Sequence, residues 1–224
     1  GFSVVTYTGN STTNTNYTVG HGLGVAPKMV IIKSRTWAAA SSAWPVWHTS
    51  SPSALVYLDS TDAASSGDYG YFMGSTAPTS SVFTVRCDTT PSTGARYRTF
   101  GNYNYVAYCF AEIAGFSKFG SFTSNANADG PFVYLGFRPK YIMIKPSSYA
   151  GEQWYIQDSS RSPTNVATAG LYANLNIAED VGTAVDLLSN GFKLRVANGA
   201  NANSGATLIY MAFAENPFKY ANAR

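Results

Sequence analysis

Apolar and polar positions follow strand periods along almost the whole chain. Residues 1–10 alternate, with Val5, Tyr7 and Gly9 on one side, which indicates a half-buried strand. Residues 29–32 form a continuous apolar run just after Pro27, a pattern typical of a strand buried on both faces. Because no segment keeps a 3.6-residue apolar period, we expect very little helix.

Turn-forming residues divide this pattern into short strands. In the first half, strands are expected at 1–10, 16–19, 29–33, 45–48, 54–58, 71–72, 82–86 and 103–111. In the second half, they are expected at 118–123, 132–133, 141–145, 154–157, 171–175, 185–188, 192–196 and 207–214. Residues 59–70 are interpreted as a loop, and 177–181 as a single helical turn. This spacing favours an all-β sandwich or barrel over alternating strands and helices.

Two further patterns, a turn signal in the second half and a repeat between the two halves, indicate how the strands are arranged. Asn190-Gly191 lies between two apolar runs and predicts a hairpin, since both residues tolerate positive φ. Residues 23–33 and 135–145 are identical at six of eleven positions, and each half ends on Phe-Ala-Glu, at 110–112 and 213–215. We interpret the chain as a tandem duplication of two jelly-roll-like β-sandwich units, 1–114 and 115–224. Strand exchange between the two units is left open.

The composition narrows the classes of partner. Charged residues make up 12% of the 224 residues, against roughly 25% in an average soluble protein, so the surface is polar but nearly neutral. The net charge is +3 without a cluster of Lys or Arg, which argues against a nucleic-acid partner. No apolar run approaches the roughly 18–20 residues that span a bilayer, so we expect no membrane insertion. The start at Gly1 leads us to expect a segment of a longer protein.

Catalytic and metal-binding signatures are weak. Two histidines in separate loops and no GxSxG motif argue against a Ser or Cys nucleophile. CxxC and HExxH spacings are absent, and we interpret Asp59, Asp62 and Asp68 as solvated turn acids. Cys87 and Cys109 are expected to be partly buried free thiols. We therefore predict no catalytic residue, no metal and no cofactor.

A glycosidase would need two carboxylates roughly 5–10 Å apart across a cleft. The recurrent acids Glu112 and Glu215 each end a closing strand, where pairing with a nearby Lys or Arg is the more common arrangement. A glycan-active hydrolase that uses Glu112, Asp158 or Glu215 stays as an alternative.

Aromatic residues make up 15% of the chain and supply the binding candidates. Tyrosines in or beside loops are suited to stacking on sugars or to packing against a partner subunit, and strand-end tyrosines equally often cover a sandwich edge. Trp44 and Trp154 recur at matched positions and are expected in the core, whereas Trp37 and Trp47 do not recur. The candidate binding residues are Trp37, Trp47, His48, Tyr69, Tyr71, Tyr97, Tyr103 and Tyr149.

Several segments resemble a known family over nearly the whole chain. They are VTYTGN (5–10), HGLGVAPKMVIIK (21–33), YVAYCFAEIAGFSKFGSF (105–122), DGPFVYLGFRPKYIMIK (129–145), LLSNGFKLR (187–195) and MAFAENPFKYANAR (211–224). Together they are similar to a domain of unknown function found in tail proteins of tailed bacteriophages. The resemblance carries over no catalytic residue.

The resemblance implies a virion component made in the bacterial cytoplasm, the C-terminal part of a tail fibre or similar appendage. The implied partners are other virion proteins, further copies of the chain in a homotrimer, and a glycan or protein on the host cell surface. The leading hypothesis is a non-enzymatic module for host attachment. The alternatives are a head or tail decoration protein that only packs against other subunits, and the hydrolase named above.

Overall fold

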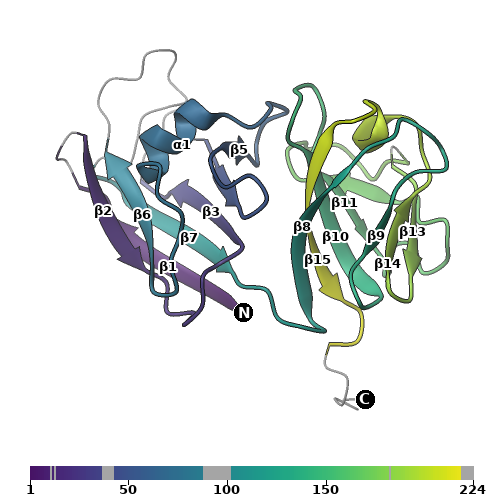
Figure 1. Ribbon diagram of the computed structural model, residues 1–224, viewed down its shortest axis with the longest axis horizontal. Coiled ribbons are helices and arrows are strands. Elements are labelled where there is room, and N and C mark those ends of the chain that lie inside the picture. The colour runs from purple at the N-terminus through teal and green to yellow at the C-terminus, as the bar shows by residue number, and fades with distance from the viewer. Residues whose placement is uncertain (11, 13, 37–42, 88–101, 182, 218–224) are drawn as a thin grey trace. The chain divides into compact units, whose positions relative to one another are not determined.

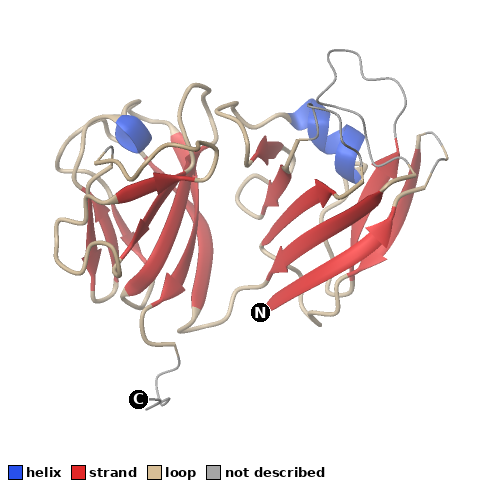
Figure 2. Cartoon of the chain, turned by 180° about the vertical axis from the view of Figure 1, so that it is seen from behind, coloured by secondary structure: helices blue, strands red, loops and turns tan. Residues whose placement is uncertain are grey.

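The structure is a computed structural model that describes residues 1–10, 12, 14–36, 43–87, 102–181 and 183–217, without the side chains of Tyr71 and Cys87. Strands make up 43% of the chain and helix 5%, which confirms the expected all-β fold (Figure 2). The chain forms two compact units. Unit 1 consists of Gly1–Asp59 with Ala64–Ala111, and unit 2 consists of Ser60–Ala63 with Glu112–Arg224.

Unit 1 is a two-layer β-sandwich in which all paired strands are antiparallel (Figure 1). Its five-stranded sheet has the order β1 (Phe2–Thr8), β7 (Asn104–Phe110), β3 (Met29–Ser34), β4 (Pro45–His48) and β5 (Leu55–Tyr57). The second sheet pairs β2 (Thr15–Gly20) with β6 (Val82–Cys87), and the helix α1 (Ser66–Met73) packs beside β6. Side chains of both sheets form one core, which includes Ile32, Trp47 and Phe83.

Unit 2 is built in the same way. Its five-stranded sheet has the order β8 (Ser117–Thr123), β15 (Thr207–Ala214), β10 (Pro139–Pro146), β11 (Tyr155–Asp158) and β12 (Gly170–Tyr172). The second sheet has the order β9 (Phe132–Tyr134), β14 (Gly191–Leu194) and β13 (Val185–Leu188), and a 3₁₀ turn, η2 (Gly199–Asn201), precedes β15. The core again draws on both sheets, with Ile144, Phe192 and Leu208 among its buried members.

The strand orders of the two larger sheets correspond one to one. β1, β7, β3, β4 and β5 occupy the places that β8, β15, β10, β11 and β12 occupy in unit 2. In the smaller sheets, the pair β2 and β6 corresponds to β9 and β14. Every sheet of the described chain is formed by strands of one unit. This correspondence supports, as an inference, the tandem duplication expected from the sequence.

The expected loop at 59–70 and strand at 71–72 are wrong, because residues Ser66–Met73 form α1. Ser65 caps the helix through its Oγ, which accepts from the N–H of Asp68 at 3.3 Å. Gly74 ends it in the left-handed conformation at φ 55°. Phe72 and Met73 are buried, so the helix is held by its packing on the core.

The helical turn expected at 177–181 is also wrong. Asp180 instead forms an isolated β-bridge with Gly170, through backbone hydrogen bonds of 2.7 and 3.0 Å. The hairpin expected at Asn190-Gly191 is confirmed, since Leu188 pairs with Gly191 between β13 and β14. Its reason differs from the expected one. Gly191 does not have positive φ, and a Cβ there would collide with the carbonyl oxygen of Val133.

Both helical elements of the described chain are short, eight residues in α1 and three in η2. Neither is long and apolar enough to cross a membrane.

Candidate functional site

Three of the sequence-predicted binding residues lie inside unit 1. Trp47, His48 and Tyr69 expose 4%, 1% and 5% of their surfaces. Trp47 donates from Nε1 to the carbonyl of Pro52 at 3.2 Å, and Nδ1 of His48 accepts from the N–H of Ser50 at 3.1 Å. These contacts make the three side chains part of the packed interior, where a ligand on the surface does not reach them.

The other candidates are dispersed. Trp37 and Tyr97 lie outside the described residues, and Tyr71 lies on α1 with its side chain outside the description. Tyr103, in unit 1, exposes 42% of its surface. Tyr149, in unit 2, is half-buried, and its hydroxyl donates to the carbonyl of Gly199 at 3.5 Å.

A different pair of aromatic residues faces solvent on β9 of unit 2. Phe132 exposes 46% of its surface and Tyr134 exposes 60%, whereas Val133 between them exposes 6%. In a strand, residues two apart share a face, so both rings lie on the solvent side of the three-stranded sheet. Sequence reasoning missed them because it searched loops, although alternation over three residues was available as a signal.

Strand register brings polar groups to the same side of this sheet. Phe132 pairs with Lys193, and Lys193 pairs with Asp186. Paired residues in an antiparallel sheet project to the same face, so the aromatic ring, the ammonium and the carboxylate form one row. Tyr134 pairs with Gly191, which has no side chain, and the Phe132 ring lies near the place where a Cβ of Gly191 would stand.

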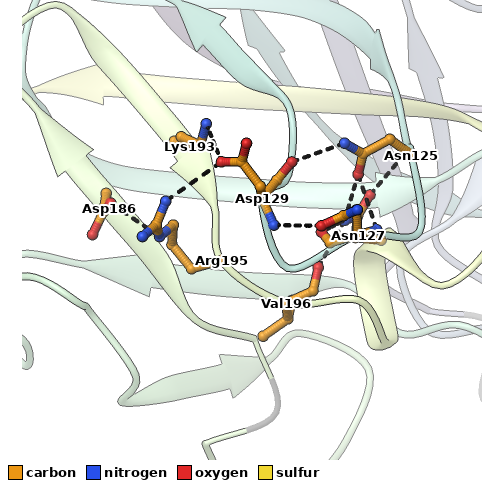
Figure 3. Close-up of polar contacts among 8 residues, drawn as sticks. Asn125, Asn127, Asp129, Asp186, Lys193, Arg195 and Val196 are labelled. Atoms are coloured by element: carbon orange, nitrogen blue, oxygen red, sulfur yellow. Dashed lines mark hydrogen bonds and ion pairs between the residues drawn. The ribbon is translucent and has the colours of Figure 1, made fainter.

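The charges on this face are paired (Figure 3). Asp129, in the loop before β9, lies 2.7 Å from Lys193 Nζ and 3.7 Å from Arg195, measured from its Oδ1. Arg195 Nε also lies 3.4 Å from Asp186. The hydrogen bond from Lys193, and then its charge and that of Arg195, lower the pKa of Asp129. Two cations and two anions therefore balance on this surface.

Side-chain amides fix the loop that carries Asp129, and Figure 3 shows Asn125 and Asn127 among them. Asn201, on η2, is fully buried, and its Nδ2 lies within 3.0 Å of Asn125 Oδ1, Asn127 O and Val196 O. Its Oδ1 accepts from the N–H of Asn125 at 3.0 Å. Asn127 Oδ1 in turn accepts from the N–H of Asp129 at 2.8 Å. The loop is thus held by side-chain amides rather than by a strand.

Lys118, on β8, also contacts Tyr134. Its Nζ donates to the backbone carbonyl of Tyr134 at 3.0 Å and lies 5.1 Å from the centroid of the Tyr134 ring. We call the resulting surface the aromatic face. It consists of Phe132, Tyr134, Lys193, Arg195, Asp186 and Asp129.

Unit 1 has no such face at the equivalent place. Thr18 and Gly20 occupy the positions of Phe132 and Tyr134, as judged by their pairing with β6. Thr84 occupies the position of Lys193 and is 6% exposed. The aromatic pair and Lys193 are therefore features of unit 2, whereas Arg195 has a counterpart in Arg86 of unit 1.

The carboxylates considered for a hydrolase all have structural contacts. Glu112 Oε2 accepts from the N–H of Phe119 at 3.1 Å. Asp158 accepts from Arg161 Nε at 2.8 Å. Glu215 lies 2.8 Å from Arg138 and accepts from the hydroxyl of Ser159 at 2.8 Å. The expected pairing of a strand-end acid with a basic residue is thus seen for Glu215.

Cysteine and acidic side chains suggest no other chemistry in the described part of the chain. Cys109 is a buried free thiol, and burial raises its pKa to about 12. No three His, Cys, Asp or Glu side chains among the described residues gather closely enough to hold a metal ion.

Comparison with known proteins gives a family and little else. A search of curated proteins finds no match. Among solved structures, a chain from the structure titled "Crystal Structure of the STIV MCP" matches over 100% of both chains, at 11% identity and a TM-score of 0.24. A TM-score this low supports no inference about fold or function. The family model described as "Domain of unknown function (DUF7483)" matches residues 1–217. The chain belongs to this domain family.

Proposed function

We propose that the chain is a non-enzymatic virion protein that binds a glycan on the host cell surface through the aromatic face. The observation that carries the binding proposal is the exposed pair Phe132 and Tyr134, on a strand whose flanking charges are held in place. The placement in a tail fibre or similar appendage rests on the resemblance of the segments quoted above to phage tail proteins.

A sugar is the ligand whose chemistry matches this surface. A pyranose ring presents C–H groups on its faces, which pack on aromatic rings, and hydroxyls at its rim, which need donors and acceptors. The aromatic face offers both, because Lys193 and Arg195 donate while Asp129 and Asp186 accept. We propose a neutral glycan rather than a polyanion, because Asp129 and Asp186 offset Lys193 and Arg195, and Lys118 is engaged by the backbone carbonyl and the ring of Tyr134.

The fixed loop supports binding rather than turnover. Groups held before a ligand arrives lose less conformational entropy on binding, which raises affinity. The acids Glu112, Asp158 and Glu215 accept hydrogen bonds from backbone or basic groups, an arrangement that supports a structural role for each. A non-enzymatic module remains our proposal on that ground.

The test is binding of the labelled 224-residue protein to a glycan array and to whole cells of candidate hosts. We expect saturable binding that Phe132→Ala and Tyr134→Ala each weaken about tenfold or more, the loss expected for removing an aromatic anchor. Ile177→Ala is the matched control, because Ile177 is 54% exposed in the same unit but lies off the face. If all variants bind equally, the aromatic face is not the binding site. If Tyr103→Ala instead abolishes binding, the site lies in unit 1.

One observation favours a packing role as a second candidate. Five large apolar side chains of unit 2 are exposed within 16 residues of sequence, a density that often marks a protein contact. They are Val166, Leu171, Leu175, Ile177 and Val181. A folded protein that is silent on glycans and cells would support this decoration role. Release of reducing sugar would instead support the hydrolase.

A further inference from the structure

The edge strand β1 of unit 1 directs half of its backbone groups away from the sheet. Its register with β7 is continuous from Phe2 to Thr8. The N–H of Ala111 donates to Gly1 and the N–H of Gly9 donates to Tyr103, so odd-numbered residues bond to β7. The N–H and C=O groups of Phe2, Val4, Thr6 and Thr8 therefore point outward. Among the described strands, β7 is the only neighbour of β1.

This edge lacks the devices that usually protect a sheet. The seven residues Phe-Ser-Val-Val-Thr-Tyr-Thr include no charge and no proline, and their register shows no bulge. Phe2 and Val4 expose 54% and 53% of their surfaces. Phe2 also packs on Phe110 of β7, with ring centroids 4.7 Å apart, so the apolar surface continues onto the sheet.

The equivalent edge in unit 2 is partly covered by the chain itself. The outward-facing N–H of Phe119, on β8, donates to the carboxylate of Glu112 at 3.1 Å. The N–H of Ser117 donates to Ile113 O at 2.9 Å. Lys118 adds a charge to the same strand. Of these two equivalent edges, β1 is the one without such contacts among the described residues.

We propose that β1 pairs antiparallel with β1 of a second copy of this chain, and so joins two five-stranded sheets across a two-fold axis. The outward groups match in one register, with Phe2 opposite Thr8 and Val4 opposite Thr6 of the second copy. Strand addition of this kind satisfies backbone groups on both sides. The interface is isologous, as in most homodimers.

A second copy suits this edge better than a charged partner strand. A two-fold axis repeats every charge near itself, so a single Lys or Glu in β1 would be repelled by its own copy. β1 carries neither. The pairing also predicts a dimer, whereas the tail-protein resemblance implies a trimer, so the mass in solution separates the two. Because β1 belongs to unit 1, this proposal is independent of glycan binding by unit 2.

The experiment is sedimentation velocity of the 224-residue protein over a range of concentrations, with circular dichroism to check folding. We expect a monomer–dimer equilibrium whose dissociation constant rises about tenfold or more in Val4→Lys, which sets repelling charges on the edge. Val25→Lys is the matched control, since Val25 is also 53% exposed but lies outside β1. It should dimerise normally.

A second variant tests the backbone directly. Thr6→Pro removes an outward N–H that β7 does not use, and proline is tolerated at such edge positions. We expect a folded monomer. A wild-type protein that stays monomeric at every concentration overturns the proposal, as does a dimer or trimer that both folded variants leave intact.

Discussion

The smaller sheets of the two units have equivalent strands but different surfaces. In unit 2, Phe132 and Tyr134 lie on β9, and β14 is followed in the sheet by a third strand, β13. In unit 1, Thr18 and Gly20 take the aromatic positions, and α1 packs on β6 instead of a third strand. Phe83 and Phe192 are buried at matched positions, whereas the residues on the outer face differ. The aromatic face is thus a feature of unit 2, on strands that have counterparts in unit 1.

The largest expected effect tests whether the cores are equivalent. Phe83 and Phe192 occupy matched positions, both expose 0%, and each makes edge-on ring contacts, with Tyr7 at 5.9 Å and Tyr210 at 5.8 Å. Phe83→Ala and Phe192→Ala should each lower the free energy of unfolding of its unit by about 3–5 kcal/mol. Denaturant unfolding measures both. Losses that differ by more than twofold would contradict the equivalence.

A glycine pair sharpens the difference between the smaller sheets. A Cβ at Gly191 would strike the carbonyl of Val133, so Gly191→Ala should destabilise unit 2 by about 1–3 kcal/mol. At Gly20 the nearest atom to such a Cβ is Ser81 O at 3.9 Å. Gly20→Ala should therefore leave the unfolding midpoint nearly unchanged. Equal shifts in both variants would show that close backbone approach does not explain Gly191.

The loop that bears Asp129 provides a third test. Asn201→Ala removes a fully buried amide and leaves several loop groups without partners, so we expect a loss of about 1–3 kcal/mol. It should also weaken glycan binding, because Asp129 and Lys193 would no longer be held. Asn198→Ala is the control, since the side chain of Asn198 makes no capping hydrogen bond to η2. If Asn201→Ala is less stable but binds the glycan with unchanged affinity, the proposal that a fixed loop raises affinity is wrong.

The smallest expected effect on stability at neutral pH comes from the tyrosines of unit 2. Burial, as the largest cause, raises the pKa of Tyr141, Tyr172 and Tyr210 to about 12 in unit 2. Below pH 10 these phenols are neutral in both states, so they add no pH dependence. Between about pH 10 and 12 the unfolded chain loses its protons first, so stability falls as pH rises. Absorbance of tyrosinate near 295 nm, followed with unfolding, should show these residues ionising only near pH 12.

Sequence patterns predicted the strands well because their signals are local. Turn residues and apolar runs placed β3, β10 and the hairpin of β13 and β14 within a few residues of their observed bounds. The helix α1 was missed because Tyr71-Phe72 suggested a strand, although Ser65 and Asp68 supply a capping pattern three residues apart. The cap was available as a local signal, since the Ser65 side chain accepts from the N–H of Asp68.

The aromatic face could be predicted only in part. Trp47, His48 and Tyr69 looked available because aromatic residues near turns often are, yet burial depends on which elements cover them. Phe132 and Lys193 are 61 positions apart in the sequence and become neighbours only through the register of β9 with β14. A single sequence gives no direct signal of that register. Alternation around Val133 was the one local hint.

The hydrogen bond that Glu112 accepts from β8 bears on how further units could be added to such a chain. Glu112 belongs to the Phe-Ala-Glu that ends the first half of the sequence, and it accepts from an outward N–H of β8. If every added unit were covered in this way by the residues just before it, the first strand of each later unit would keep this cover. Elongation would then not multiply uncovered edges of this one kind. The same three-residue ending would serve as both the finish of one module and the seal of the next.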